Sequence, residues 1–311
     1  MLPSPAESGP ERADSRGRPA ADGGLMAAPV AAVVEFAPPR LAEAGISAGG
    51  CFARPLPLDP TCSAAARRFF RESVAGLDLP SDLIHDGITM ASELAANTLH
   101  ADGNVEFGSS SQRPLSGCPE FWLYARGEGA KYELICKVFD SDQGWETGSL
   151  PDINARTYES VSGRGLQVVA GLSAGQWGAH LTRGRLGSWK VPGKAVWFAL
   201  RVPPGSGLAR VRRQLFSAAD AVSELEVMLA ERGLGGRLVR ADEPAVGMSV
   251  LSVSCDLTVW CRSGTASWRR PDGGYDRYPL TDLVEIAERV VCAHEELHAP
   301  TAVPAGRSRN R

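Results

Sequence analysis

The sequence predicts a protein of the mixed α/β class, with its folded core in the middle of the chain. Amphipathic segments, whose apolar residues recur at the spacing of about 3.6 that buries one side of a helix, alternate there with short apolar runs typical of strands. In order, we expect helices at about 61–75 and 81–101, strands at 121–125 and 132–139, a helix opening at 162–166, and strands at 177–181 and 195–202.

Local signals support the bounds of these elements. Asp59 or Thr61 can cap the first helix, and Ser81 or Asp82 the second, because such side chains accept hydrogen bonds from the first amides of a helix. We expect a strand at 51–58, and the glycine-containing segment 126–131 predicts a hairpin. A strand near Val105, a surface loop at 108–119 and a mobile polar loop at 145–162 complete this unit.

Composition excludes several classes of protein. The chain has 311 residues, 43% of them hydrophobic, which suits an ordinary globular core. Its net charge of −3 gives no chain-wide field that would favour nucleic acid or an anionic membrane. No apolar run approaches the roughly 18 residues of a membrane span, and no signal peptide is recognisable. We therefore expect a cytoplasmic protein that binds neither a membrane nor, directly, nucleic acid. Seven cysteines stand singly, as reduced structural thiols do.

Changes in composition divide the chain into five segments. Residues 1–50 and 299–311 are expected to be disordered, and 51–205 form the folded unit, which ends at a Pro-Pro-Gly break. An amphipathic helix within 206–234 either docks on this unit or forms a homodimer, and both alternatives stay open. A small module at 235–298 follows, with a β-meander (248–253, 257–261 and 266–269), a turn at 271–274 and a helix at about 281–298.

The small module carries aromatic and basic residues but no catalytic constellation. We expect its aromatic residues to form its core, because a short module needs large side chains to bury enough area. We interpret its arginines as ordinary surface residues, although they could contact an acidic partner. The aromatic residues are Trp260, Trp268, Tyr275 and Tyr278, and the arginines are Arg262, Arg269, Arg270 and Arg277.

In the larger unit, polar residues stand at the ends of secondary elements, where ligand sites tend to lie. Glu93 and Asn97 are four residues apart and share one helix face, where a hydrated metal ion with a phosphate would satisfy both. Asp140 ends a strand and could accept a hydrogen bond from an exocyclic amine. Gly163 and Gly165 open a helix, so backbone amides there can approach an anion that the helix dipole favours.

These residues resemble the motifs of the small anti-sigma-factor serine kinases and their actinobacterial relatives, within the GHKL superfamily of gyrase-like, chaperone and histidine-kinase ATPases. The resemblance covers about 52–202. It rests on four short sequence motifs, which we call boxes, at 93–101, 140–144, 163–166 and 193–198. It implies an α+β two-layer sandwich of the GHKL (Bergerat) type, with three helices over a mixed sheet. ATP would bind between the sheet-covering helices, and 145–162 would be the lid.

The resemblance also implies a role for each matching residue. Asn97 would bind a Mg²⁺ ion that bridges the phosphates, Asp140 would accept a hydrogen bond from the adenine amine, and Glu93 would be the general base. The remaining box residues would complete the nucleotide site, with the backbone of 163–165 along the phosphates; they are Gly144, Gly163, Arg164, Gly165 and Leu166. Phosphoryl transfer depends mainly on positioning and charge stabilisation, so no covalent nucleophile is needed.

The function implied is a Mg-ATP-binding regulatory protein, a serine/threonine kinase that binds a sigma factor or phosphorylates an anti-sigma-factor antagonist. Two positions depart from the family pattern. Asp142 stands where the first glycine box has a glycine, and Ala195 where relatives usually have a threonine near the adenine. The alternative is a non-catalytic module with a degenerate nucleotide site that only holds a partner protein.

Two rival functions find less support. The segment 294–298 reads His-Glu-Glu-Leu-His and matches the H-E-x-x-H motif of zinc hydrolases. No Asp, Glu, His or Cys follows His298 as a third ligand, so a solvated helix end is the simpler interpretation. A two-component histidine kinase would need an upstream phosphoacceptor histidine, and residues 1–50 contain none.

Overall fold

The computed structural model describes residues 45–46, 49–100, 118–128, 131–141, 164–187, 190–210 and 216–299. All of them belong to one compact unit, residues 39–311. Most of the segments expected to be disordered, the strand near Val105 and the candidate lid at 145–162 lie outside the described residues. No helix in the described ranges is long and apolar enough to cross a bilayer.

The first sheet, sheet A, holds five of the six strands expected in the larger unit, all but the one near Val105, in the order β1-β2-β3-β5-β4. Its strands are β1 (Cys51–Pro55), β2 (Glu120–Glu128), β3 (Lys131–Asp140), β4 (Trp177–Arg183) and β5 (Pro192–Val202). β2 and β3 form the expected hairpin, with Phe121 opposite Val138. All neighbouring pairs of these strands are antiparallel, so the expectation of a mixed sheet is wrong for the described strands.

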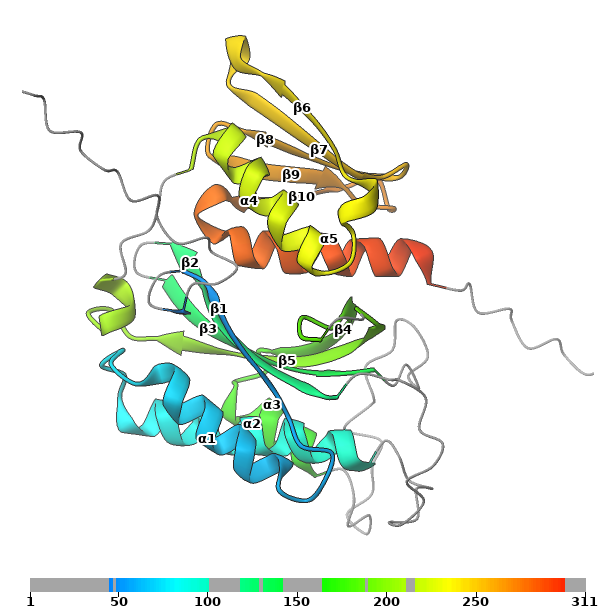
Figure 1. Ribbon diagram of the computed structural model, residues 1–311. Helices are drawn as coiled ribbons and strands as arrows, with labels where there is room; N and C mark the ends of the chain where they lie inside the picture. The colour runs from blue at the N-terminus through cyan, green and yellow to red at the C-terminus, as the bar shows by residue number, and fades with distance from the viewer. Residues whose placement is uncertain are drawn as a thin grey trace, which may run out of the picture. The chain divides into compact units, whose positions relative to one another are not determined.

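Three helices lie against one face of sheet A, which we call its helix face (Figure 1). They are α1 (Cys62–Val74), α2 (Ser81–His100) and α3 (Gly165–Leu172), each where the pattern of apolar residues predicts a helix. Thr61 occupies the N-cap position of α1, and its amide donates a hydrogen bond of 2.8 Å to the Asp59 carboxylate. Helices gathered on one face of an antiparallel sheet make this part of the chain an α+β fold.

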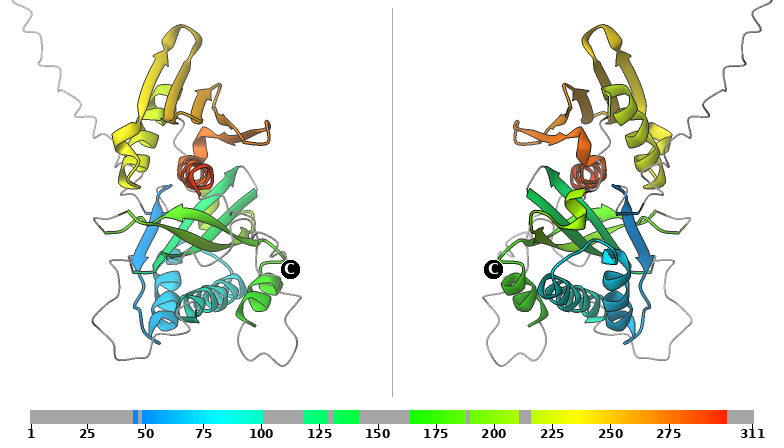
Figure 2. Two further views of the ribbon diagram at one scale, coloured as in Figure 1. Left: turned by 90° about the vertical axis from the view of Figure 1, so that its right-hand side faces the viewer. Right: turned by 90° about the vertical axis from the view of Figure 1, so that its left-hand side faces the viewer.

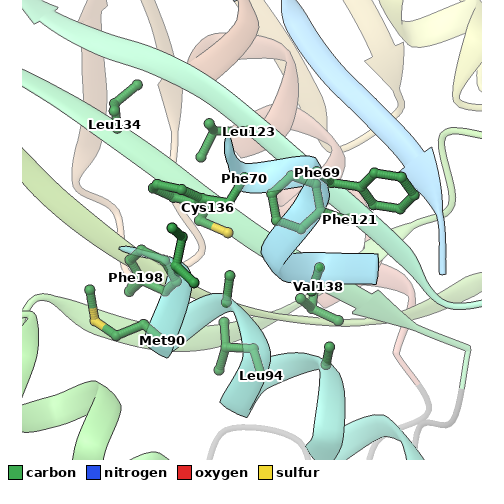
Figure 3. Close-up of a cluster of buried hydrophobic side chains, with 14 of the residues drawn as sticks. Phe69, Phe70, Met90, Leu94, Phe121, Leu123, Leu134, Cys136, Val138 and Phe198 are labelled. Carbon is green, nitrogen blue, oxygen red and sulfur yellow. The ribbon is translucent and has the colours of Figure 1, made fainter. Parts of the chain in front are cut away.

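The core between these helices and sheet A is apolar and rich in phenylalanine (Figure 3). The rings of Phe69 on α1 and Phe121 on β2 have centroids 6.1 Å apart, a separation typical of aromatic pairs. Gly87 lets α2 approach α1 closely, because a Cβ at this position would lie only 2.1 Å from the Phe70 ring. Met90 and Leu94 continue the buried side of α2 toward the sheet.

A second sheet, sheet B, occupies the C-terminal part, in the order β10-β9-β8-β7-β6. Its strands are β6 (Val239–Glu243), β7 (Met248–Ser254), β8 (Leu257–Arg262), β9 (Thr265–Arg269) and β10 (Tyr275–Pro279). The expected meander corresponds to β7, β8 and β9, and the sequence pattern missed the two edge strands. The linking helix is also shorter than expected, because a 3-10 turn at Gly207–Arg210 is followed by α4 only from Ala218 to Glu231.

The C-terminal helix α5 (Leu283–His298) lies between the two sheets in all of the ribbon views (Figures 1 and 2). It packs on the outer face of sheet A, the face opposite α1, α2 and α3. One buried apolar cluster therefore joins Tyr124, Ile135 and Ala199 of sheet A to residues of α4, α5 and sheet B. Neither face of sheet A is left to solvent at its centre.

The aromatic residues of the C-terminal part are divided between the core and the surface. Trp268 is buried and stacks on Tyr278, with ring centroids 5.4 Å apart. Trp260 is 37% exposed and Tyr275 is 54% exposed. The expectation that all four rings form a core is therefore wrong for Trp260 and Tyr275. Both alternate with inward-facing neighbours on their strands and so stand on the other face of sheet B.

Candidate functional site

Helix α2 places Glu93 and Asn97 at the edge of the core. Ala91, Leu94 and Ala95 are buried against the sheet, whereas Glu93 and Asn97 are only partly buried. The four-residue spacing puts both polar side chains on one side of the helix, as the sequence predicts. This side faces the neighbouring helix α3 at its first residue.

Glu93 and Gly165 are in close contact. A Cβ added at Gly165 would lie 2.6 Å from Oε2 of Glu93, which is closer than real Cβ contacts come. A side chain at Gly165 would therefore displace the Glu93 carboxylate, a shift that the flexible glutamate side chain can accommodate. The structure thus brings the first and third of the sequence boxes together at the N-terminus of α3, where the first backbone amides have no partner within the helix and the dipole is positive.

The Asn97 side chain has a buried amide nitrogen, Nδ2, with no hydrogen-bond partner among the described residues. A buried donor without an acceptor costs about 1–3 kcal/mol, so native proteins rarely keep one. A phosphate oxygen would accept from Nδ2, and rotation of the amide by 180° would present its oxygen to a Mg²⁺ ion instead. The residue type and its surroundings fit the role that the resemblance implies.

Asp140 ends β3 and is paired in register with Lys194 of β5. Both side chains stand on the helix face of sheet A, since they continue the alternation of Val138 and Val196. The Nζ of Lys194 lies 3.8 Å from Oδ2 of Asp140, and both side chains are largely buried. An ammonium group thus lies beside the carboxylate that would bind the adenine amine. The sequence analysis did not identify Lys194 as part of the site.

Ala195 lies on the opposite face of the sheet from Asp140. It is fully buried in a small cluster with Trp122 and Phe139, where the ring of Trp122 stacks on Phe139. A threonine at this position, as in the family pattern, would therefore not point its hydroxyl toward Asp140. The β5 residue whose side chain lies near the Asp140 carboxylate is Lys194, and not Ala195.

The other sequence-predicted site residues are only partly described. Arg164 is exposed and occupies the N-cap position of α3, and Leu166 is buried and anchors α3 in the core. Three of these positions lie outside the described residues: Gly144, Gly163 and Asp142, the last of which differs from the family pattern. The structure therefore brings Glu93 to the start of α3, with Asn97 one turn further along the same side of α2, and it places Asp140 on the helix face of sheet A.

The H-E-x-x-H segment is a solvated helix end only in part, because Glu296, Leu297 and His298 are exposed whereas the two residues before them are not. His294 and Glu295 are buried, and the carboxylate of Glu295 accepts from Arg183 of β4. The His294 and His298 rings stack with centroids 4.2 Å apart, and His298 Nδ1 lies 2.7 Å from the His294 carbonyl oxygen. Among the described residues, no group of three or more His, Cys, Asp or Glu side chains could hold a metal ion.

Sequence reasoning also missed a buried charge network between sheet A and α5. At its centre, the Glu288 carboxylate lies 3.2 Å from Lys137 Nζ and 3.4 Å from an Arg185 guanidinium nitrogen, and it also accepts from Arg232. The Glu288 side chain is 1% exposed. Burial alone would raise its pKa, but Arg232, Lys137 and Arg185 hold the pKa of Glu288 well below its usual value.

Glu285, one helical turn earlier, forms the second centre of this network. Its carboxylate accepts from the Tyr124 hydroxyl at 2.5 Å and from Arg126 at 2.8 Å, and Arg289 lies at 2.8 Å. Burial opposes the charged form, yet Lys137, Arg289 and Arg126 lower the pKa of Glu285 to about 2. Both glutamates are therefore ionised at neutral pH, and both hold α5 on the outer face of sheet A.

Two sequence signals could have revealed this network. Lys137 stands in the middle of the apolar strand run Leu-Ile-Cys-Lys-Val-Phe, and a lysine buried there needs a counter-charge. Glu285, Glu288 and Glu295 are spaced by three and seven residues, which places them on one face of a helix. A matching set of basic and acidic residues in two buried elements predicts that the elements meet.

No protein-family model matches this chain, and no curated protein matches it. The assignment of a family accordingly remains a proposal. It rests on the four sequence boxes and on the geometry described above.

Proposed function

We propose that this chain is a Mg-ATP-binding regulatory protein of the anti-sigma-factor kinase type. The observation that carries the proposal is the contact between Glu93 and Gly165, because it places a carboxylate directly beside the N-terminus of a helix. The positive end of the helix dipole favours a carboxylate there, and beside bound phosphates this carboxylate would have a task that involves a proton or a bound cation. General-base work beside a phosphate site is such a task.

The residues present would divide the work as follows. Asn97 would hold the Mg²⁺ ion, the backbone at 163–165 would bind the phosphates, and Asp140 would accept the adenine amine. Bound Mg²⁺ would neutralise charge on the phosphates. Glu93 would take the proton of an attacking serine hydroxyl on a partner protein, for which we propose a sigma factor or an anti-sigma-factor antagonist.

A second candidate is a non-catalytic module that holds its partner with a degenerate nucleotide site. The observation that favours it is Lys194, whose ammonium lies 3.8 Å from the Asp140 carboxylate. An ammonium in this position competes with the adenine amine for the same acceptor. The two candidates differ in whether the protein binds ATP at all.

The test is calorimetric titration of Mg-ATP onto the full chain. The full chain is needed because α5 covers the outer face of sheet A, and a fragment without α5 would expose Tyr124 and leave Lys137 unpaired. We expect the wild type to bind, and Asn97→Ala and Asp140→Asn to bind roughly 10- to 100-fold more weakly, the effect of losing one hydrogen bond to a charged group. Asp82→Asn, an exposed acid on the same helix α2, is the matched control.

Glu93→Gln separates binding from catalysis. This substitution keeps the size of the side chain but removes the base, so Mg-ATP should still bind while phosphate release or transfer is lost. A wild-type chain that takes up no Mg-ATP at millimolar concentration would refute nucleotide binding and leave the partner-binding module. Binding without any turnover in the presence of sigma-factor and antagonist proteins would refute the kinase.

A further inference from the structure

The outer face of sheet B, opposite the core with α4 and α5, is an open surface with exposed aromatic rings. Trp260 on β8 and Tyr275 on β10 stand on it and are 37% and 54% exposed. No described helix covers either ring. An exposed tryptophan near the centre of a sheet is unusual, because large aromatic side chains contribute most when they are buried.

Three arginines stand among these rings. In the strand register, Ser267 of β9 has Trp260 on one side and Arg277 on the other. Arg269 lies two residues further along the same strand and so on the same face, directly opposite Tyr275. Arg262 lies two residues from Trp260 on β8. The small Ser267 side chain is thus ringed by arginines and aromatic rings, a few ångströms to about 8 Å away.

The charges of this face are not balanced by neighbours. Arg262, Arg269 and Arg277 are exposed, and within the described ranges none forms an ion pair or side-chain hydrogen bond. By contrast, Arg240 on the inner face is paired with Asp242 at 2.7 Å, and Arg270 in the turn lies 3.3 Å from Asp272. The acidic residue on the outer face is Glu243, at the far edge strand β6. The cationic side of the face therefore lacks a counter-charge.

We propose that the outer face of sheet B binds single-stranded nucleic acid, with bases stacked on Trp260 and Tyr275 and phosphates bound by Arg262, Arg269 and Arg277. Exposed rings interleaved with basic side chains on an open surface are the features that single strands need, since every base offers a face for stacking. An acidic protein segment would bind better to a surface with apolar pockets for anchor residues. This function is independent of the nucleotide site on α2 and α3.

The net charge of −3 argues against a chain-wide attraction for nucleic acid, but it does not decide this local question. Charges further away than a Debye length, about 8 Å at physiological salt, are largely screened. With strands about 4.8 Å apart and residues about 3.4 Å apart along a strand, Arg269 and Arg277 lie about 8 Å from each other and act together, whereas Arg262 lies about 12 Å from Arg277 and would bind a separate phosphate. Trp260 and Tyr275 are about 12 Å apart by the same geometry, so they stack on separate bases.

The experiment measures binding of a fluorescent oligothymidylate of about 12 nucleotides to the full chain by anisotropy, at several salt concentrations. Three phosphate contacts predict a slope of log K against log salt near −2, since each contributes about −0.7 for a single strand. Trp260→Ala should weaken binding roughly 5- to 100-fold, and Tyr275→Ala should do the same. Arg269→Gln and Arg277→Gln should each make the slope shallower by about 0.7.

Arg68→Gln is the control, because Arg68 is an exposed arginine on α1, far from sheet B in the fold. It should change neither affinity nor slope. All the substituted side chains on the sheet are exposed, so their melting temperatures should stay at the wild-type value.

Three results would overturn the proposal. The first is no binding of the oligothymidylate at low salt. The second is binding that keeps its affinity in both Trp260→Ala and Tyr275→Ala, because the rings would then play no part. The third is a polyglutamate peptide of equal charge that displaces the oligonucleotide at the same concentration, which would identify an acidic protein segment as the occupant.

Discussion

The Nζ of Lys137, in the middle of sheet A, lies 3.2 Å from Oε2 of Glu288 on α5, and both side chains are at most 3% exposed. The C-terminal helix is therefore fixed to the larger unit by a buried ion pair, in addition to apolar packing. Arg185 and Arg232 share the same carboxylate. One acid thus compensates three cations that are largely buried, and its removal would leave all three without the carboxylate that they share.

We predict that Glu288→Gln destabilises the protein by about 3–5 kcal/mol, the range measured when one partner of a buried pair is removed. The physical reason is that Lys137, Arg185 and Arg232 would stay buried with an amide that cannot offset their charge. Chemical denaturation of the full chain, followed by circular dichroism, measures the change in the free energy of unfolding.

Glu231→Gln is the control for this prediction. Glu231 is an exposed glutamate at the end of α4, and a surface change of this kind usually alters stability by less than about 0.5 kcal/mol. Equal losses in Glu288→Gln and Glu231→Gln would show that the buried network does not hold α5 in place.

Gly165 supplies a second prediction. In Gly165→Ala the new methyl group would overlap the Glu93 carboxylate, which lies 2.6 Å from the position of the Cβ. We expect the carboxylate to move and the methyl group to hinder the approach of phosphates to the backbone at the start of α3, so the affinity for Mg-ATP should fall at least roughly tenfold, equivalent to about 1.4 kcal/mol. Calorimetric titration of the purified variant measures this loss.

Gly171→Ala, on the same helix, is the matched control, because a Cβ there meets nothing within 4 Å. Alanine is favoured over glycine inside a helix by about 1 kcal/mol, so this variant should be slightly more stable and bind Mg-ATP normally. A Gly165→Ala variant that binds as tightly as Gly171→Ala would rule out the close approach as a requirement of the site.

Much of the larger unit could be predicted from the sequence because its signals are local. The helical spacing around Leu94 and the alternation along β2 and β3 depend only on neighbours in the chain, and both predict the observed elements. The pairing of Glu93 with Asn97 on one helix face follows from spacing as well. Their approach to Gly165 follows only from the resemblance to a family, because 72 residues separate Glu93 from Gly165.

The sequence could not predict features that depend on a distant segment. Whether Trp260 lies in a core or on a surface depends on which face of sheet B meets α4 and α5, and the strand pattern alone leaves that choice open. The burial of Glu288 depends on its meeting Lys137, which is 151 residues away in the chain. The face of sheet A on which Ala195 stands could be assigned only from the register of β3 against β5.

Acid should weaken the protein through Glu285. Its pKa is lowered from 4.5 to about 2, so the folded state holds it ionised while the unfolded state takes up a proton. This stabilisation is complete above the unfolded pKa near 4.5 and is lost as pH falls toward 2, a total of roughly 3 kcal/mol. In Glu285→Gln that acid-dependent loss should be smaller by about this amount, as measured by denaturation at a series of pH values.

Glu296→Gln, on the exposed side of the same helix, serves as the comparison. It should retain the wild-type dependence of unfolding free energy on pH. If Glu285→Gln also retained that dependence, the ion pairs with Arg126 and Arg289 would not control stability in acid.

His180 predicts a second loss of stability, at milder pH. Its ring is largely but not fully buried on β4, with Nε2 3.3 Å from Lys137 Nζ, and burial together with Lys137 lowers its pKa well below 6.5, against the opposing influence of Glu288 and Glu285. Arg289 also faces it and lowers the pKa. The folded state therefore keeps the ring neutral while the unfolded state takes up a proton near pH 6.5, so stability falls as the pH drops below that value.

We expect His180→Gln to abolish this dependence, because glutamine does not titrate. The wild type should lose roughly 1 kcal/mol of unfolding free energy between about pH 7.5 and 5.5, and the variant should lose much less. His85→Gln, at an exposed position on α2, should behave as the wild type does. A wild-type free energy of unfolding that stays constant through this range would mean that His180 takes up a proton in the folded state, which its position beside the Lys137 ammonium opposes.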